Sequence, residues 1–206
     1  VYPKMCPQPM KEECLLTGTL EPTNEPFGIA KIAGMKMCES YNRQYGTDFI
    51  SVTPTNVYGI NQNYTPMNSM VVPAMIRKFH EAKTNNSPEV SIWGTGRPSR
   101  DFIFADDLAN ASIFLAKNYS DNEPLNIGTG KDYTIHELAS IIQDVVDYEG
   151  NIVYDKSRPD GVIMRLQNIS KLSELGWKYT MELRDGIRLA YKDFLQKQFT
   201  EYDGII

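Results

Sequence analysis

The sequence predicts an α/β fold, in which short buried strands alternate with amphipathic helices. Strand-like apolar runs recur along the chain, and two of them end at Pro54 and Gly128. Segments with apolar residues at every third or fourth position separate these runs. The chain has 206 residues, of which 41% are apolar and 23% charged, so it can form one sizeable core, or one core and a small lobe.

The N-terminal part is predicted to combine a loop with one long helix. Residues 1–25 are rich in proline and acidic side chains and show no periodicity, which predicts a loop. Pro26 begins the helix, because its missing N–H group costs no hydrogen bond in a first turn. Gly46 ends it. Apolar side chains recur at every fourth position of this helix: Ile29, Ala33, Met37 and Tyr41.

The middle of the chain is predicted to return to a strand and then to a second helix. The apolar run at 49–52, closed by Pro54, predicts a buried strand. Residues 55–70 are rich in asparagine, proline and serine, which predicts an irregular loop. Residues 71–83 predict a helix with a basic outer face, and residues 89–93 predict another strand.

Two adjacent aspartates follow a further predicted strand at 102–104 and open a helix that runs to about Lys117. A carboxylate pair of this kind suggests either a metal site or the start of a helix. Asp106 and Asp107 occupy the positive end of the predicted helix, which favours capping. We therefore predict no metal site.

The C-terminal part is predicted to contain short elements. A capping box at Thr134–Glu137 begins a helix that runs to about Val146. The other expected elements are strands at 125–127 and 152–154, a candidate strand at 166–169, and short helices from Ser170 and Leu183. Up to about residue 55 the pattern is typical of the last part of a doubly wound sheet, and the remainder forms a mixed lobe.

Charge and cysteine content exclude some classes of partner. The net charge is −5 and the pI about 5.1, which argues against a nucleic-acid partner but not against nucleotides. No apolar run approaches the roughly 20 residues of a membrane span, and no signal peptide is recognisable. The three cysteines lack metal-ligand spacing, so we expect reduced thiols and a cytoplasmic protein without a membrane partner.

The residue pair Phe27 and Lys31 carries most of the chemical information. Their i, i+4 spacing places both side chains on one face of the predicted helix. A tyrosine at the first position would form the acid/base pair of a reductase, in which the ammonium lowers the pKa of the phenol. Phenylalanine has no exchangeable proton, so the arrangement is kept and the proton donor is lost.

Several motifs together resemble the GDP-L-fucose synthase family of extended short-chain dehydrogenases/reductases. Enzymes of that family epimerise GDP-4-keto-6-deoxymannose at C3 and C5 and then reduce its C4 ketone with NADPH. The motifs that carry the resemblance are Pro22–Pro26, the helix of Lys31, Pro54–Gly59, Trp93–Gly96, Asp106–Leu108, Asn126–Gly130 and Pro159–Gly161.

The resemblance implies the C-terminal part of a Rossmann-type doubly wound domain plus a small mixed α/β substrate lobe. Residues 1–60 would be the residual dinucleotide-binding domain. Residues 61–206 would be mainly the substrate lobe, with one or two strands returning to the sheet. The family's Gly-rich fingerprint and its catalytic serine and cysteine would precede Val1. Gly94–Gly96 cannot replace the fingerprint, because it lacks the third glycine and opens no helix.

The resemblance also assigns roles to individual positions. Phe27 occupies the position of the family's general acid, and Met70 that of a histidine used during epimerisation. Lys31 corresponds to the lysine that binds the nicotinamide ribose of NADP. The residues implied in cofactor binding are Lys31, Pro54, Thr55, Asn56 and Val57. Those implied in GDP-sugar binding are Val71, Lys78, Trp93, Arg100 and Asp160.

Three functional hypotheses follow from these residues. The chain is one part of a GDP-L-fucose synthase with little activity of its own, an inert GDP-sugar-binding homologue, or a split-gene fragment that needs a partner chain. The expected partners are a GDP-sugar and either a second copy, through the helix of Lys31, or a chain that supplies the N-terminal half.

Overall fold

The computed structural model describes residues 1–66 and 69–197, and it confirms the predicted α/β fold. Helix α1 spans Glu25–Tyr45, with a proline in its first turn and Gly46 at its C-terminus in the left-handed conformation, at φ 64°. The segment before it holds two 3-10 turns, η1 (Glu12–Cys14) and η2 (Pro22–Asn24).

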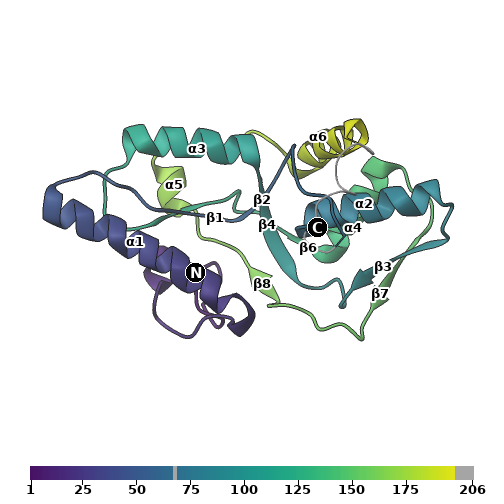
Figure 1. The fold of residues 1–206 in the computed structure, drawn as a ribbon, viewed down its shortest axis with the longest axis horizontal. Helices are drawn as coiled ribbons and strands as arrows, with labels where there is room; N and C mark the ends of the chain where they lie inside the picture. The colour runs from purple at the N-terminus through teal and green to yellow at the C-terminus, as the bar shows by residue number, and fades with distance from the viewer. Residues whose placement is uncertain (67–68, 198–206) are drawn as a thin grey trace.

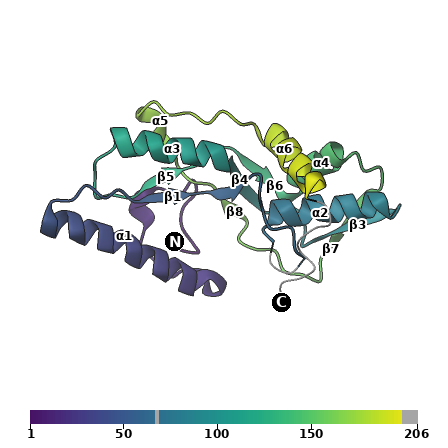
Figure 2. The same cartoon turned by 45° about the horizontal axis from the view of Figure 1, so that its top comes forward.

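Most of the apolar surface of α1 is exposed. Within the helix only Gly28 and Ile32 are buried. Met37 is 63% exposed and Tyr41 46% exposed, although both belong to the apolar series that the sequence places on one face. Figure 2 shows α1 as a separate rod on one side of the strands. The helix itself is therefore as predicted, whereas its apolar face is not covered by the described residues.

A parallel pair of strands, β1 (Val52–Pro54) and β5 (Leu125–Ile127), forms the sheet nearest to α1. A strand from the C-terminal portion thus pairs with one from the N-terminal portion. Helices α3 (Ala105–Asn118) and α5 (Ser170–Glu174) lie close to this pair in Figure 1. Their side chains share one buried cluster with the strands: Ile103, Ala111, Leu115, Leu125, Ile127, Leu172 and Trp177.

The long strand β4 (Ser99–Phe104) connects the two halves of the molecule (Figure 1). It pairs in parallel with β2 (Asn56–Tyr58) and β8 (Met164–Arg165), and antiparallel with β6 (Asp132–Thr134). The sequence predicted a loop at 55–70 and a candidate strand at 166–169, so β2 was missed and β8 lies slightly earlier. Both strands are very short, and their pairing with β4 defines them rather than any local apolar pattern.

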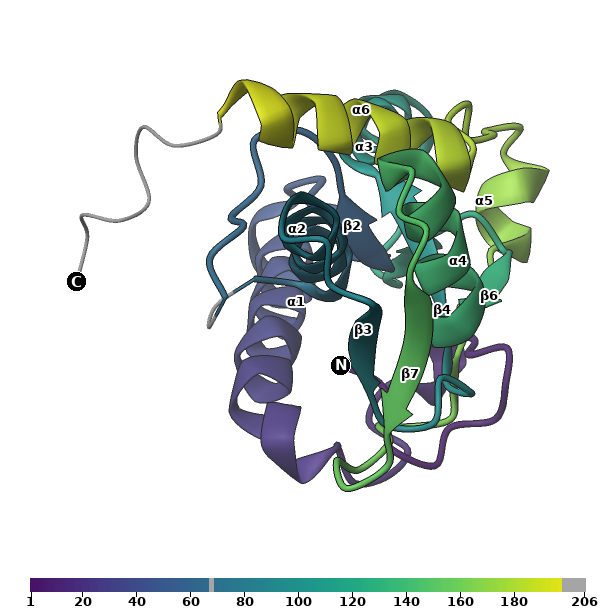
Figure 3. The ribbon, with the colours of Figure 1, turned by 90° about the vertical axis from the view of Figure 1, so that its right-hand side faces the viewer.

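The largest core lies in the other half. Figure 3 shows helices α2 (Val71–Thr84), α4 (Ile135–Val146) and α6 (Leu183–Gln196) gathered beside the parallel strands β3 (Glu89–Trp93) and β7 (Asn151–Asp155). The predicted capping box opens α4. Helix α6 has 14 residues, so it is not the short helix that was expected. Side chains that contribute to this core and are fully buried include Ile76, Phe79, Leu138, Ile142 and Ile187.

The predicted capping role of the paired aspartates is wrong. Helix α3 has Phe104 at its N-cap position, and no side chain caps it. Asp107 is buried and accepts hydrogen bonds from the amides of Thr180 and Met181, at 3.1 and 2.8 Å. Its carboxylate therefore holds the segment that leads into α6. The sequence could not indicate this, because the partners lie more than 70 residues away.

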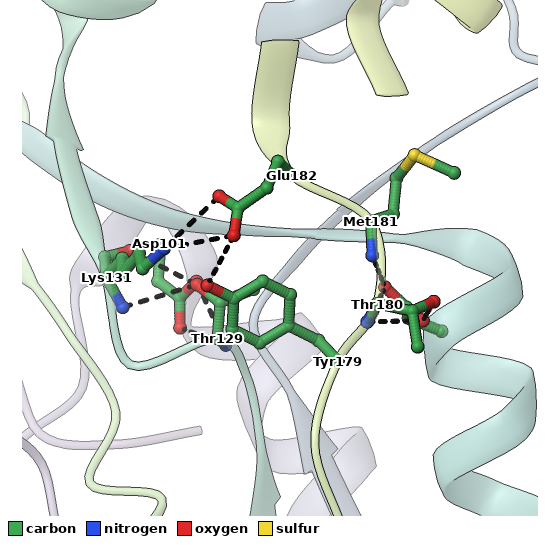
Figure 4. Close-up of polar contacts among 8 residues, drawn as sticks. Asp101, Thr129, Lys131, Tyr179, Thr180, Met181 and Glu182 are labelled. Atoms are coloured by element: carbon green, nitrogen blue, oxygen red, sulfur yellow. Dashed lines mark hydrogen bonds and ion pairs between the residues drawn. The ribbon is translucent and has the colours of Figure 1, made fainter. Parts of the chain in front are cut away.

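A second buried carboxylate, Asp101 on β4, fixes the loop after β5. It accepts hydrogen bonds from the hydroxyl and amide of Thr129, at 2.5 and 3.0 Å (Figure 4). Burial raises the pKa of Asp101, and these hydrogen bonds oppose that shift. Figure 4 also shows the ion pair between Lys131 and Glu182, which spans the loop and the start of α6. Asp101 thus fixes the loop after β5 to β4, and Asp107 fixes the segment before α6 to α3.

Candidate active-site cavity

A cavity of about 530 Å³ lies between α1 and the edge of β1 that β5 does not cover. It brings together five residues that the sequence singled out: Phe27, Lys31, Pro54, Thr55 and Asn56. The remaining lining residues are Val1, Tyr2, Met10, Met35, Ser51, Val52, Thr53, Arg165 and Gln167. Pro54, Thr55 and Asn56 lie at the carboxyl end of β1. In open α/β sheets, ligands bind at the carboxyl ends of the strands.

The predicted geometry of the Phe27 and Lys31 pair is confirmed. The Lys31 Nζ atom lies 5.3 Å from the centre of the Phe27 ring, a cation–π arrangement. The ring is 64% exposed. Within the described residues the ammonium makes no hydrogen bond or ion pair, so it is available to a ligand. The pair offers a positive charge and an apolar face, and its phenyl ring has no exchangeable proton.

The loop that follows β1 is fixed in place by the central strand. Thr55 Oγ1 and Asn56 Nδ2 both donate to the backbone carbonyl of Asp101, at 3.0 and 2.8 Å. The amide of Thr55 donates to the carbonyl of Ile127 at 2.9 Å. Val57 belongs to β2, packs against the smaller core and does not line the cavity. The rigid wall is thus formed by residues 54–56.

The residues expected to bind the GDP-sugar lie outside this cavity. Val71 and Lys78 are on α2, and Lys78 Nζ donates to the carbonyl of Ser91. Burial lowers the pKa of Lys78. Trp93 ends β3 and is 68% exposed, with the guanidinium of Arg158 5.1 Å from its ring centre. This exposed pair offers a flat aromatic surface and a positive charge to a ligand.

Two more of these expected residues have structural partners. Asp160 accepts hydrogen bonds from the amide and hydroxyl of Thr95, at 2.8 and 2.7 Å, and these bonds lower its pKa. They hold the turn at Gly94, where an added Cβ would lie 2.3 Å from the Asp160 carboxylate. Arg100 donates to the carbonyl of Ser99 at 2.6 Å, and burial lowers its pKa.

Met70 and the two histidines do not line the cavity. Met70 is 62% exposed at the start of α2 and does not line the cavity. His80 packs between Tyr191 and Phe194 on α6. His136 Nδ1 lies 2.5 Å from the hydroxyl of Tyr154. No histidine among the described residues therefore contacts Phe27 or Lys31.

Among the lining residues that the sequence motifs did not indicate are Tyr2, Met10, Arg165 and Gln167. Tyr2 Oη donates to Asn126 Oδ1 at 2.5 Å, and burial raises the pKa of Tyr2 to about 12. A loop prediction for residues 1–25 gives no reason to expect a buried tyrosine. Arg165 and Gln167 have the i, i+2 spacing of one strand face, a signal that is too short to recognise alone.

Within residues 1–66 and 69–197, no group of three or more histidine, cysteine, aspartate or glutamate side chains could hold a metal ion. In the same ranges, no helix combines the length and apolar character needed to cross a bilayer.

Comparison with known proteins identifies the family. The model of the NAD dependent epimerase/dehydratase family matches residues 1–128. The chain belongs to the NAD-dependent epimerase/dehydratase family. This membership agrees with the cavity at the carboxyl end of β1 and with the position of Lys31 beside it.

Within the epimerase/dehydratase family, the chain is similar to GDP-L-fucose synthases. It is 50% identical to probable GDP-L-fucose synthase 1 of Oryza sativa subsp. japonica over 196 residues, which cover 95% of this chain and 60% of that protein. It is 49% identical to GDP-L-fucose synthase of Escherichia coli K12, with 96% of this chain and 64% of that protein covered. The chain therefore spans about three fifths of the length of these relatives.

Solved structures in the same comparison have the same fold. A crystal structure of a GDP-6-OMe-4-keto-L-xylo-heptose reductase from C. jejuni superposes with a TM-score of 0.89 at 38% identity and covers 96% of this chain and 68% of that one. A GDP-L-fucose synthetase from Naegleria fowleri bound to NADP superposes with a TM-score of 0.88 at 26% identity, over 95% and 63% of the two chains. The expected similarity to Rossmann-type GDP-sugar enzymes is confirmed.

Proposed function

We propose that this chain forms the substrate-binding part, and the lysine side of the active site, of a GDP-sugar epimerase/reductase of the GDP-L-fucose synthase type. Residues 1–60 belong to the cofactor domain and residues 61–206 mainly to the substrate lobe. The work of the chain is to bind and orient a GDP-4-keto sugar, in the cytoplasm. On its own it reduces such a sugar very slowly or not at all.

The juxtaposition of Phe27 and Lys31 in the cavity carries this proposal. Reduction of a ketone requires a proton at the developing alkoxide. A positioned general acid typically contributes about 10²–10⁴-fold in rate, and a phenyl ring contributes none. Met70, at the position of the family's histidine, also has no proton to exchange near neutral pH.

NADP fits the wall of the cavity in part. Lys31 and the loop at 54–56 would hold its nicotinamide end, and the cofactor would supply the hydride. The ammonium of Lys31, which forms no hydrogen bond or ion pair with the described residues, and the rigid loop support this assignment. No glycine-rich turn that opens a helix occurs in this sequence to hold the diphosphate of the cofactor.

Restoring the phenol tests the assignment. Phe27→Tyr is made in this chain joined to the portion of the E. coli relative that it does not span, and NADPH oxidation is followed with GDP-4-keto-6-deoxymannose. We expect turnover to rise about 10²–10⁴-fold. Phe49→Tyr is the matched control, because Phe49 is also exposed but lies outside the cavity. Equal rates for both variants, with NADPH bound, would refute the role of position 27.

A second candidate function is GDP-sugar binding without turnover. The groups assigned to nucleotide binding are present: Trp93 with Arg158, Lys78 and Arg100. The two positions that would transfer protons are replaced, by Phe27 and Met70. Calorimetry with GDP-mannose should then show saturable binding and no chemistry. We assign Arg100 to the diphosphate of the GDP-sugar, which a guanidinium can contact through two parallel hydrogen bonds. Arg100→Ala should therefore weaken binding. Unchanged affinity would remove Arg100 from the site.

We also expect α1 to contact another protein chain, because many of its apolar side chains are exposed. That chain is either a second copy, in a homodimer, or a chain that supplies the N-terminal half. Sedimentation of the chain alone distinguishes these possibilities, because a homodimer forms without any added chain.

A further inference from the structure

The N-terminal segment forms a small buried cluster that contains two cysteines. Tyr2, Cys6 and Met10 are its buried members, and the partly buried Cys14 packs against them. Burial, followed by a hydrogen bond with the side chain of Cys14, raises the pKa of the Cys6 thiol to about 12. The two thiols are therefore neighbours in the folded chain, although seven residues separate them in the sequence.

The backbone of this segment brings the two cysteines together. The amide of Lys4 donates to the carbonyl of Thr19 at 2.8 Å, which closes the segment into a loop. The amide of Cys6 donates to the carbonyl of Pro3 at 3.2 Å, so this cysteine is held just inside the closure. Cys14 ends the turn η1 on the returning side of the loop. Both cysteines thus sit on backbone that hydrogen bonds hold in place.

Only one of the two thiols has to be reached from solvent for the pair to react. Cys14 is partly exposed, so a small molecule can contact its sulfur. Cys6 is 8% exposed, but it has only to reach its neighbour. Exchange between thiols and disulfides proceeds through a mixed disulfide, which a second nearby thiol resolves. The third cysteine, Cys38, lies on α1, outside this cluster.

We infer that Cys6 and Cys14 form a reversible disulfide when a small-molecule disulfide such as oxidised glutathione accumulates. The Cys14 thiolate attacks one sulfur of oxidised glutathione and releases a glutathione thiolate. The Cys6 sulfur, once it has lost its proton, attacks the Cys14 sulfur and releases the second glutathione. Two protein thiols are oxidised, and one glutathione disulfide is reduced to two glutathione thiols, which take up the two protons.

This disulfide would close a loop that belongs to the wall of the cavity. Met10, between the two cysteines, lines the cavity. Glu12, also between them, is buried and accepts from the amide of Asn126 at 3.0 Å. A disulfide stabilises a fold mainly by restricting its unfolded chain. Oxidation therefore clamps the loop at 6–14 onto the strands, and reduction releases it.

The test treats the intact 206-residue chain with oxidised glutathione, blocks the remaining thiols with N-ethylmaleimide, and maps the products by mass spectrometry of peptides. We expect a cross-link between Cys6 and Cys14, with Cys38 outside it. The melting temperature should rise by about 5–10 °C, and dithiothreitol should reverse both changes. Closure should be about tenfold faster at pH 8 than at pH 7, because a thiol with a pKa of about 12 gains about tenfold more thiolate.

Cys14→Ser and Cys38→Ser are matched variants, because each removes one partly exposed thiol. Cys38→Ser should keep the cross-link and the rise in melting temperature, whereas Cys14→Ser should abolish both. A glutathione adduct that stays on Cys14 of the folded wild-type chain, without a cross-link, would overturn the inference. A cross-link that forms only in urea would overturn it too, because the native fold would then not bring the thiols together. Neither result depends on GDP-sugar binding.

Discussion

Replacing Asp107 by alanine should destabilise the chain far more than the same change at its neighbour Asp106. Asp107 is 4% exposed and accepts from the hydroxyl of Thr180 at 2.7 Å, and from the amides of Thr180 and Met181 at 3.1 and 2.8 Å. Hydrogen bonds to a charged group contribute about 1.5–3 kcal/mol each. Because the contributions of hydrogen bonds to one carboxylate are not additive, we expect Asp107→Ala to lower the free energy of unfolding by about 3–5 kcal/mol.

Urea unfolding at pH 7, followed by circular dichroism, measures this loss. A stability of about 5–15 kcal/mol is usual for a domain, so Asp107→Ala should lower the midpoint strongly. Asp106 is exposed, and Asp106→Ala should cost no more than about 0.5 kcal/mol. If the two variants lose similar free energy, helix-end charge rather than anchoring of the Thr180 segment would explain both, and our assignment would be wrong.

Two further predictions concern packing and pH. Gly186→Ala should destabilise the fold by about 1–3 kcal/mol, because the added Cβ would lie 2.2 Å from the hydroxyl of Tyr58. In Gly34→Ala the added Cβ meets nothing within 4 Å, so this change should stabilise α1 by up to about 1 kcal/mol. Equal shifts in the melting temperatures of the two variants would contradict this prediction. Burial raises the pKa of Cys6 and of Tyr2 to about 12, from 9.0 and 10.0. Their contribution is complete below pH 9 and lost as the pH rises toward 12. Urea titrations at pH 8, 9 and 10 should therefore show little change in the first step and falling stability in the second, and Cys6→Ala should flatten the second step; an unchanged slope would exclude this residue as the source.

The candidate site was predicted only in part from the sequence. Phe27 and Lys31 were placed correctly relative to each other, because both belong to one helix with a fixed repeat. Their meeting with residues 54–56 also followed from the motifs. Arg165 and Gln167 were missed, because a two-residue strand has no periodicity of its own and is defined by its neighbour.

The sequence by itself determined the end of α1 at Gly46, the capping box at Thr134, and the absence of a proton donor at position 27. These are local features, set by the dihedral preferences and side-chain chemistry of residues close together in the chain. Only the tertiary structure decided that Asp107 anchors the Thr180 segment and that Arg165 and Gln167 meet Lys31 around one cavity. Those contacts join segments far apart in the chain, and they depend on the pairing of strands whose short patterns do not specify their partners.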